Sequence, residues 1–98
     1  MTIEKAINAG AAFLKITGML DTETAPQLEA LLDSELAGIN NLTIDFEALE
    51  YVSSAGLRVI LKAQKLMNGK GKMKIIHVNE SVMEIFEITG FTGILTIE

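Results

Sequence analysis

The sequence predicts an α/β domain that occupies residues 1–98 as a single unit. A chain of 98 residues fits one domain, and with 49% apolar residues it can bury one hydrophobic core. After two strand-like segments, helix-like and strand-like segments alternate, which indicates crossover connections between parallel strands. We therefore expect the order β-β-α-β-α-β-α-β, with a mixed, mostly parallel sheet of about five strands covered by helices.

The first two segments are predicted to form a β-hairpin. Apolar and polar residues alternate loosely over residues 3–7, and a strand-like run covers residues 11–19. The sequence Asn-Ala-Gly at residues 8–10 lies between them and is typical of a turn.

A helix is predicted to follow the hairpin. Residues 21–26 combine Asp and Thr caps, acidic residues and an early proline, which is the pattern of a helix start. Gly38 is expected to end this helix. Its core-facing positions recur at helical spacing and are all leucines: Leu28, Leu31, Leu32 and Leu36.

The middle of the chain is predicted to hold a strand and a second helix. Residues 42–46 form the strand, and a loop is expected to follow through Glu50. The helix runs from about Ser54 to Asn68, and its broad apolar face favours packing on a sheet. Residues 68–71 contain two glycines and mark a break.

The last part of the chain is predicted to add a strand, a helix and a final short strand. The first of these covers residues 73–78. Asn79 or Ser81 then caps a third helix, which stops at Gly90. Residues 94–97 are expected to form the last strand.

The charge distribution argues against a nucleic-acid partner, because the net charge is −5. The two halves differ. Residues 1–50 hold two lysines and nine acidic residues, whereas residues 51–98 hold six basic and four acidic residues. Arg58, Lys62 and Lys65 fall on one helix face, which is either a solvated face or a basic contribution to a partner surface.

Several classes of protein and site are excluded by what the sequence lacks. Without cysteine, the chain has no disulfide framework, thiolate nucleophile or cysteine-based metal site. No apolar run approaches the roughly 18–20 residues of a membrane span, and the N-terminus has no signal pattern. We therefore expect a cytoplasmic protein that does not contact a membrane.

No catalytic or cofactor motif is present, so we do not expect an enzyme or a bound cofactor or metal. A nucleophile elbow around Ser54 would need glycine where Val52 stands. The single histidine, His77, lies near the end of a predicted strand and is expected to be structural or on the surface. Residues 69–71 lack the strand-to-helix setting of a phosphate-binding loop.

The stretch Tyr51–Leu57 is the most informative part of the sequence, because Ser53 and Ser54 sit where a strand or loop meets a helix. Free N–H groups and a partial positive charge at a helix start favour a phosphate. Serine is also a preferred N-cap, so the two hydroxyls have either role. Ala55 and Gly56 are small and would let another protein approach the backbone.

Two aspartates are expected near this turn. Asp21 and Asp45 each follow a predicted strand, at the edge where α/β sheets place their functional groups. Asp21 is otherwise a helix cap, and Asp45 is otherwise an acceptor that anchors its loop. Both interpretations remain open for each residue.

The residues Tyr51–Leu57, preceded by Leu-Thr-Ile-Asp-Phe at 42–46, resemble the signature of STAS domains, and more narrowly of the bacterial anti-sigma factor antagonists. The likeness covers essentially the whole chain. It includes Gly-x-Leu-Asp at 18–21 before Thr-Ala, Gly-Lys-Gly at 69–71, and the helix-like segment 82–89 before a glycine.

The resemblance implies partner switching. In that family the unphosphorylated antagonist binds an anti-sigma factor that is also a serine kinase, and so frees the sigma factor. The kinase phosphorylates a serine of the turn and breaks the complex, and a PP2C-type phosphatase reverses the modification. The acceptor lies two residues before the turn glycine, which is Ser54 here. The members with the clearest switching role usually have Asp immediately before the acceptor, whereas this chain has Ser53, the alternative acceptor.

We expect the partner to bind around the two serines, the nearby strand ends and the basic face of the following helix, and we expect the domain to act as a monomer. The alternatives are an STAS regulatory or scaffold module in a non-sigma pathway, or a small-ligand-binding STAS domain. The expected partner-binding residues are Asp21, Asp45, Ser53, Ser54, Ala55, Gly56 and Arg58.

Overall fold

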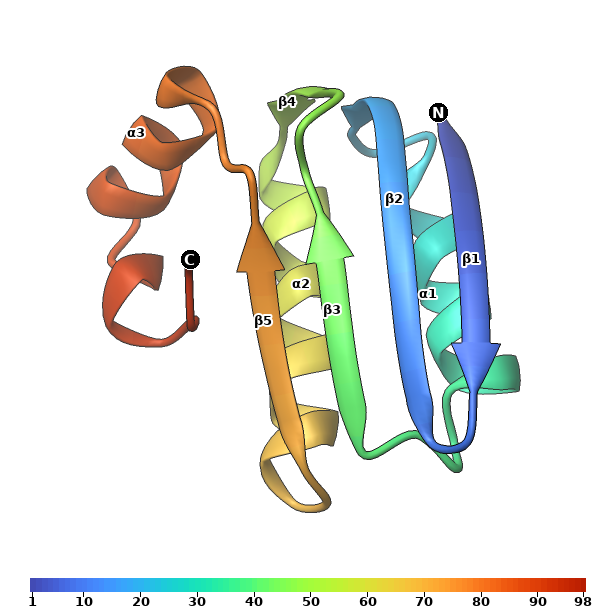
Figure 1. The fold of residues 1–98 in the computed structure, drawn as a ribbon. Coiled ribbons are helices and arrows are strands. Elements are labelled where there is room, and N and C mark those ends of the chain that lie inside the picture. The colour runs from blue at the N-terminus through green and yellow to red at the C-terminus, as the bar shows by residue number, and fades with distance from the viewer.

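The computed structural model describes residues 1–98 and contains five strands, three α-helices and one 3₁₀ turn (Figure 1). In chain order they are β1 (Thr2–Asn8), β2 (Ala11–Leu20), α1 (Ala25–Glu35), β3 (Asn41–Asp45), β4 (Leu49–Val52), α2 (Ser54–Asn68), β5 (Lys72–Ile76), α3 (Glu80–Ile88) and η1 (Phe91–Gly93).

The strands form one mixed sheet in the order β1-β2-β3-β5, with β4 paired to β2 outside this path. β1 and β2 form the expected antiparallel hairpin, and all other pairs are parallel. β3 pairs with the first half of β2, and β4 pairs with its last residues farther along the same side (Figure 1). The predicted α/β class and mostly parallel sheet are therefore confirmed.

The core lies between the sheet and the two helices α1 and α2, which run behind it in Figure 1. Alternate residues of β2 and β3 point into this layer and are fully buried, as the period of two in a half-buried strand requires. α3 packs against β4, and its Phe86 ring lies 6.3 Å, between centroids, from the ring of Phe46, which directly follows β3. α3 therefore packs at the end of the sheet from which β4 leads into Ser53 and Ser54.

One predicted loop is a strand. The sequence predicts that residues 49–50 belong to the loop after β3, but they begin β4, which pairs with β2. Leu49 and Val52 are buried, whereas the two residues between them are exposed. This in-out-out-in pattern arises where the register with β2 shifts after Gly18, so the usual alternation that signals a strand is missing.

The predicted last strand is reduced to one bridge, between Ile75 and Ile97. The chain first turns at Gly90, which has a φ of +79°, and then forms η1. Ile94 remains 49% exposed, so residues 94–97 do not lie flat along β5. At the start of α3, the side chain of Asn79 accepts the Val82 N–H at 2.9 Å, which selects Asn79 of the two predicted caps.

Candidate functional site

The two serines lie in a tight connection between β4 and α2, which we call the serine turn (residues 53–56). The Ser53 N–H donates to the carbonyl of Leu20 at 2.9 Å, and Leu20 pairs with Val52 in the sheet. The turn is thereby fixed against the end of β2, and α2 begins at a defined place and direction.

Ser53 is the N-cap of α2. Its backbone is extended, and its hydroxyl oxygen accepts the Gly56 N–H at 3.4 Å. The length of this contact makes it a weak cap. The capping role suggested by the sequence therefore belongs to Ser53, which is only partly accessible.

Ser54 is the first residue of α2 and is exposed. Its hydroxyl makes no hydrogen bond within the protein, in contrast to that of Ser53. The first turn of α2 also carries no acidic residue. The Ser54 hydroxyl is therefore free to react and lies where the helix start favours negative charge.

Gly56 allows α2 to start close to the sheet. A Cβ atom at this position would lie 2.7 Å from the Leu20 carbonyl oxygen and 2.8 Å from the Leu20 side chain. No side chain fits without movement of the helix or the strand. The glycine of the motif thus serves the packing that holds both serines in place, and Ala55 beside it is half-buried against the core.

Asp21 lies beside the serine turn, since it follows Leu20, but its carboxylate is engaged. One oxygen accepts the N–H groups of Glu23 at 3.0 Å and Thr24 at 3.1 Å, ahead of α1. The Thr24 hydroxyl completes this arrangement by donating to the carbonyl of Met19 at 2.8 Å. The carboxylate of Asp21 therefore stabilises the turn that leads into α1, whose N-cap residue, Thr24, makes no side-chain capping hydrogen bond.

Asp45 is 7% exposed at the end of β3, and its contacts define a separate corner with Glu47 and His77, which we call the Asp45 corner. Its carboxylate accepts the Glu47 N–H at 2.9 Å and lies 3.1 Å from Nδ1 of His77. Burial alone would raise the pKa of Asp45. The hydrogen bonds from Glu47 and His77, with the nearby charges of His77 and Lys15, outweigh burial and lower that pKa below its ordinary value.

None of the Asp45 contacts reaches the serine turn. The observed role of the carboxylate is to anchor the loop between β3 and β4. The backbone of His77 has a φ of +58°, and its exposed imidazole completes the corner by its contact with Asp45. The structure therefore brings Asp21 next to the serines, whereas Asp45 contacts a different set of residues.

Two exposed apolar side chains lie on β2 and β4, close in sequence to Leu20 and the serine turn, and were not predicted from the sequence. Met19 of β2 and Tyr51 of β4 are direct register partners and are 50% and 47% exposed. Tyr51 could have been singled out from the sequence, because it is the one tyrosine of the chain and stands two residues before Ser53. The place of Met19 beside Tyr51 depends on the β2–β4 pairing, which no local pattern in the sequence predicts.

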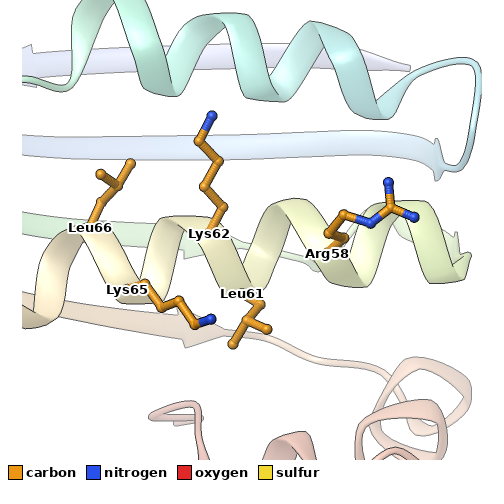
Figure 2. Close-up of a pocket in the computed structure, with 5 residues that line it drawn as sticks. All are labelled: Arg58, Leu61, Lys62, Lys65 and Leu66. Carbon is orange, nitrogen blue, oxygen red and sulfur yellow. The ribbon is translucent and has the colours of Figure 1, made fainter.

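The basic residues of α2 differ in their partners. Lys62 contacts Glu29 at 3.0 Å and Asp33 at 2.9 Å on α1. The hydrogen bond with Asp33, followed in size by that with Glu29, raises the pKa of Lys62 above its ordinary value. Arg58 and Lys65 have no acidic partner, and with Leu61, Lys62 and Leu66 they line a surface hollow of about 390 Å³ (Figure 2).

Comparison with known proteins identifies the family, because a sequence model of the STAS domain matches residues 2–98. The chain belongs to the STAS domain family. Among curated STAS proteins, it is 36% identical over 84 residues to a candidate anti-sigma factor antagonist, BtrV, of Bordetella bronchiseptica. That match covers 84% of this chain and 72% of BtrV.

Two further relatives carry the same type of name. The anti-sigma-B factor antagonist of Staphylococcus aureus is 30% identical, over 84% of this chain and 78% of the relative. The anti-sigma F factor antagonist of Paenibacillus polymyxa is 27% identical, over 99% and 86%. This STAS domain is therefore of the anti-sigma factor antagonist type, as its sequence indicated.

Solved structures confirm the fold. A candidate anti-sigma factor antagonist from Thermotoga maritima superposes with a TM-score of 0.90 at 21% identity, over 97% of this chain and 84% of that one. The unphosphorylated anti-sigma factor antagonist SpoIIAA gives 0.78 at 13% identity, over 99% and 87%. In the STAS domain described here, no helix has both the length and the apolar character that crossing a membrane requires.

Proposed function

We propose that this STAS domain is an anti-sigma factor antagonist that works by partner switching, with Ser54 as the phosphorylated residue. The observation that carries the proposal is the exposed Ser54 hydroxyl, which has no hydrogen bond within the protein and stands at the start of α2. The names of the curated relatives support the role, and one similar structure is described as SpoIIAA in its phosphorylated form.

The unphosphorylated domain binds an anti-sigma factor that also has serine kinase activity. Met19 and Tyr51 give this partner an apolar contact next to Ser54, because they are exposed at the same end of the sheet. Binding occupies the anti-sigma factor and so releases its sigma factor. The domain acts as a monomer in the cytoplasm.

The kinase supplies the general base for the transfer, since no carboxylate or imidazole of this chain contacts the Ser54 hydroxyl. The transferred phosphate adds a charge of about −1.5 to −2. At the helix start this charge gains roughly 0.3–1 kcal/mol, so the domain stays folded. A PP2C-type phosphatase removes the phosphate and restores the binding surface.

The phosphate affects the complex with the partner much more than the domain itself, because a buried or like-signed charge at an interface costs several kcal/mol of binding free energy. A loss of about 4 kcal/mol weakens binding roughly a thousandfold. The switch therefore needs only a local change at Ser54, and no refolding of the domain.

The deciding experiment incubates the domain with its cognate kinase and ATP and locates the phosphate by mass spectrometry. We expect modification of the wild type and of Ser53→Ala, and none of Ser54→Ala. In calorimetric titrations with the kinase, Ser54→Asp should bind at least about a hundredfold more weakly than Ser54→Ala. Phosphate on Ser53 alone, or equal binding by the two Ser54 variants, would contradict the proposal.

A further inference from the structure

Arg58 is the one residue on the N-terminal half of α2 that has a charge and no partner. The two carboxylates of α1 that face α2 are Glu29 and Asp33, and both contact Lys62. Arg58 is exposed and makes no hydrogen bond or ion pair within the protein. Its guanidinium is therefore available to an anion that the unmodified domain does not contain.

The position of Arg58 directs this group toward Ser54. Residues four apart on a helix are neighbours, with about 5–6 Å between their Cβ atoms. Helical side chains also lean toward the N-terminus of their helix. Figure 2 shows the Arg58 side chain extending toward the N-terminal end of α2, whereas Lys62 points across to α1.

We propose that Arg58 pairs with a phosphate carried by Ser54 of the same chain. The presence of the phosphate rests on the proposed function, but the pairing depends only on the geometry of α2. A guanidinium donates two parallel N–H groups to phosphate oxygens, a stronger arrangement than lysine provides. The free N–H groups at the start of α2 face the same phosphate from the helix end.

The pairing also distinguishes the two serines. Ser53 precedes Arg58 by five residues, and the residue four after Ser53 is Leu57, which is buried. The Ser53 hydroxyl is also turned toward the Gly56 N–H. A phosphate on Ser53 would therefore lie away from Arg58, so that only Ser54 combines an accessible hydroxyl with a cation one turn later.

Pairing has a consequence for the rest of α2, because Arg58 also lines the hollow in Figure 2. When the phosphate engages Arg58, this residue no longer offers its charge to a partner. Lys65 keeps its charge in both states. Phosphorylation at one end of α2 thus changes the electrostatic character of the adjoining surface without moving the backbone.

The test uses protein in which phosphoserine is installed genetically at position 54, so no kinase is needed. The second ionisation of the phosphate, near pH 6 in an exposed phosphoserine, is followed by ³¹P NMR against pH. We expect Arg58→Gln to raise this pKa by about half a unit. A shift of this size corresponds to the free energy of an ion pair between residues four apart on a helix when one group is doubly charged. The matched control is Lys65→Gln, which removes the same charge at about 16 Å from position 54 along α2 and should shift the pKa by about 0.1 unit or less.

Two further samples complete the test. Arg58→Lys should give an intermediate pKa, and a phosphoserine placed at position 53 should titrate at the same pH with and without the Arg58→Gln change. Equal pKa values for Arg58→Gln and Lys65→Gln at position 54, in protein shown to be folded by circular dichroism, would overturn the pairing. This outcome is distinct from a failure of the proposed function, which would appear as absence of phosphate transfer by the kinase.

Discussion

The Asp45 corner follows β3, and the serine turn follows β4; both strands pair with the same side of β2. The two sites differ in whether their polar side chains have hydrogen-bond partners within the protein. At the corner, the Asp45 carboxylate is buried and shared between a backbone N–H and His77. At the turn, the Ser54 hydroxyl is exposed and unshared. The position of a polar residue at this edge of a sheet therefore indicates a functional role only when its hydrogen-bond partners within the protein are also known.

The difference follows from what each group does for the fold. The corner stabilises the loop between β3 and β4, and any external partner would have to compete with its internal contacts. The turn obtains its stability from the backbone contact with Leu20 and from the close approach of Gly56. This separation leaves Ser54 free for chemistry, because modification of its hydroxyl breaks no contact.

The largest effect on stability is expected from Gly56→Ala. Its Cβ would meet the Leu20 carbonyl at 2.7 Å, so α2 or β2 must shift, at a cost of about 2–3 kcal/mol. The matched control is Gly69→Ala at the other end of α2, where a Cβ meets nothing and φ is −87°. Urea denaturation should show Gly69→Ala within about 0.5 kcal/mol of wild type. Equal stability of the two variants would mean that the turn tolerates a side chain and does not depend on close packing.

A smaller effect is expected from Asp45→Ala. It leaves the Glu47 N–H without its acceptor and removes the contact with His77, at a cost of about 1–2 kcal/mol at pH 7. Asp45→Asn keeps an acceptor for the N–H and should lose less. The control Asp33→Ala removes an exposed carboxylate from its contact with Lys62, and it should lose clearly less stability than Asp45→Ala because solvent screens that pair. Equal losses in urea denaturation would mean that the burial of Asp45 adds nothing to its contacts.

The pH dependence of the Asp45 contribution has a definite sign. Because the folded state lowers the pKa of Asp45, its carboxylate binds protons less readily there than in the unfolded chain. The stabilisation is therefore complete above the unfolded value of about 3.9 and is lost as pH falls through the lower folded value. Denaturation of wild type and Asp45→Asn between about pH 7 and 3 should show the two stabilities converging at the acid end. A gap that stays constant or widens would show that the charge of Asp45 does not stabilise the fold.

The sequence predicted most of the fold, because periodic apolar patterns decide long elements. The leucine spacing of α1, the broad face of α2 and the hairpin signals all appear in the structure. β4 was missed because only four residues form it and its register shifts after Gly18. The strand predicted over 94–97 reduces to the Ile97 bridge, since tertiary packing around η1 and not local alternation sets that segment.

The candidate site was predictable to a different degree. Ser53 and Ser54 could be found from their place before a helix, but the division of cap and free hydroxyl between them needed coordinates. The exposed pair Met19 and Tyr51 required the β2–β4 register, which joins residues far apart in the sequence. Local patterns therefore located the turn, whereas pairing between distant segments determines what surrounds it.

The smallest effect on stability is expected from a comparison of Ser53→Ala with Ser54→Ala, which tests the two hydroxyls of the serine turn directly. Ser53→Ala removes the contact to the Gly56 N–H and should cost about 0.5–1 kcal/mol, at the low end for a cap because the contact is 3.4 Å long. Ser54→Ala removes no hydrogen bond and should stay within about 0.5 kcal/mol of wild type in the same urea titration. If Ser54→Ala proved the more destabilising, the Ser54 hydroxyl would have a structural role, and the contrast with Asp45 would disappear. The expected order instead gives Ser53 a role in stability and leaves the Ser54 hydroxyl available for the proposed phosphorylation.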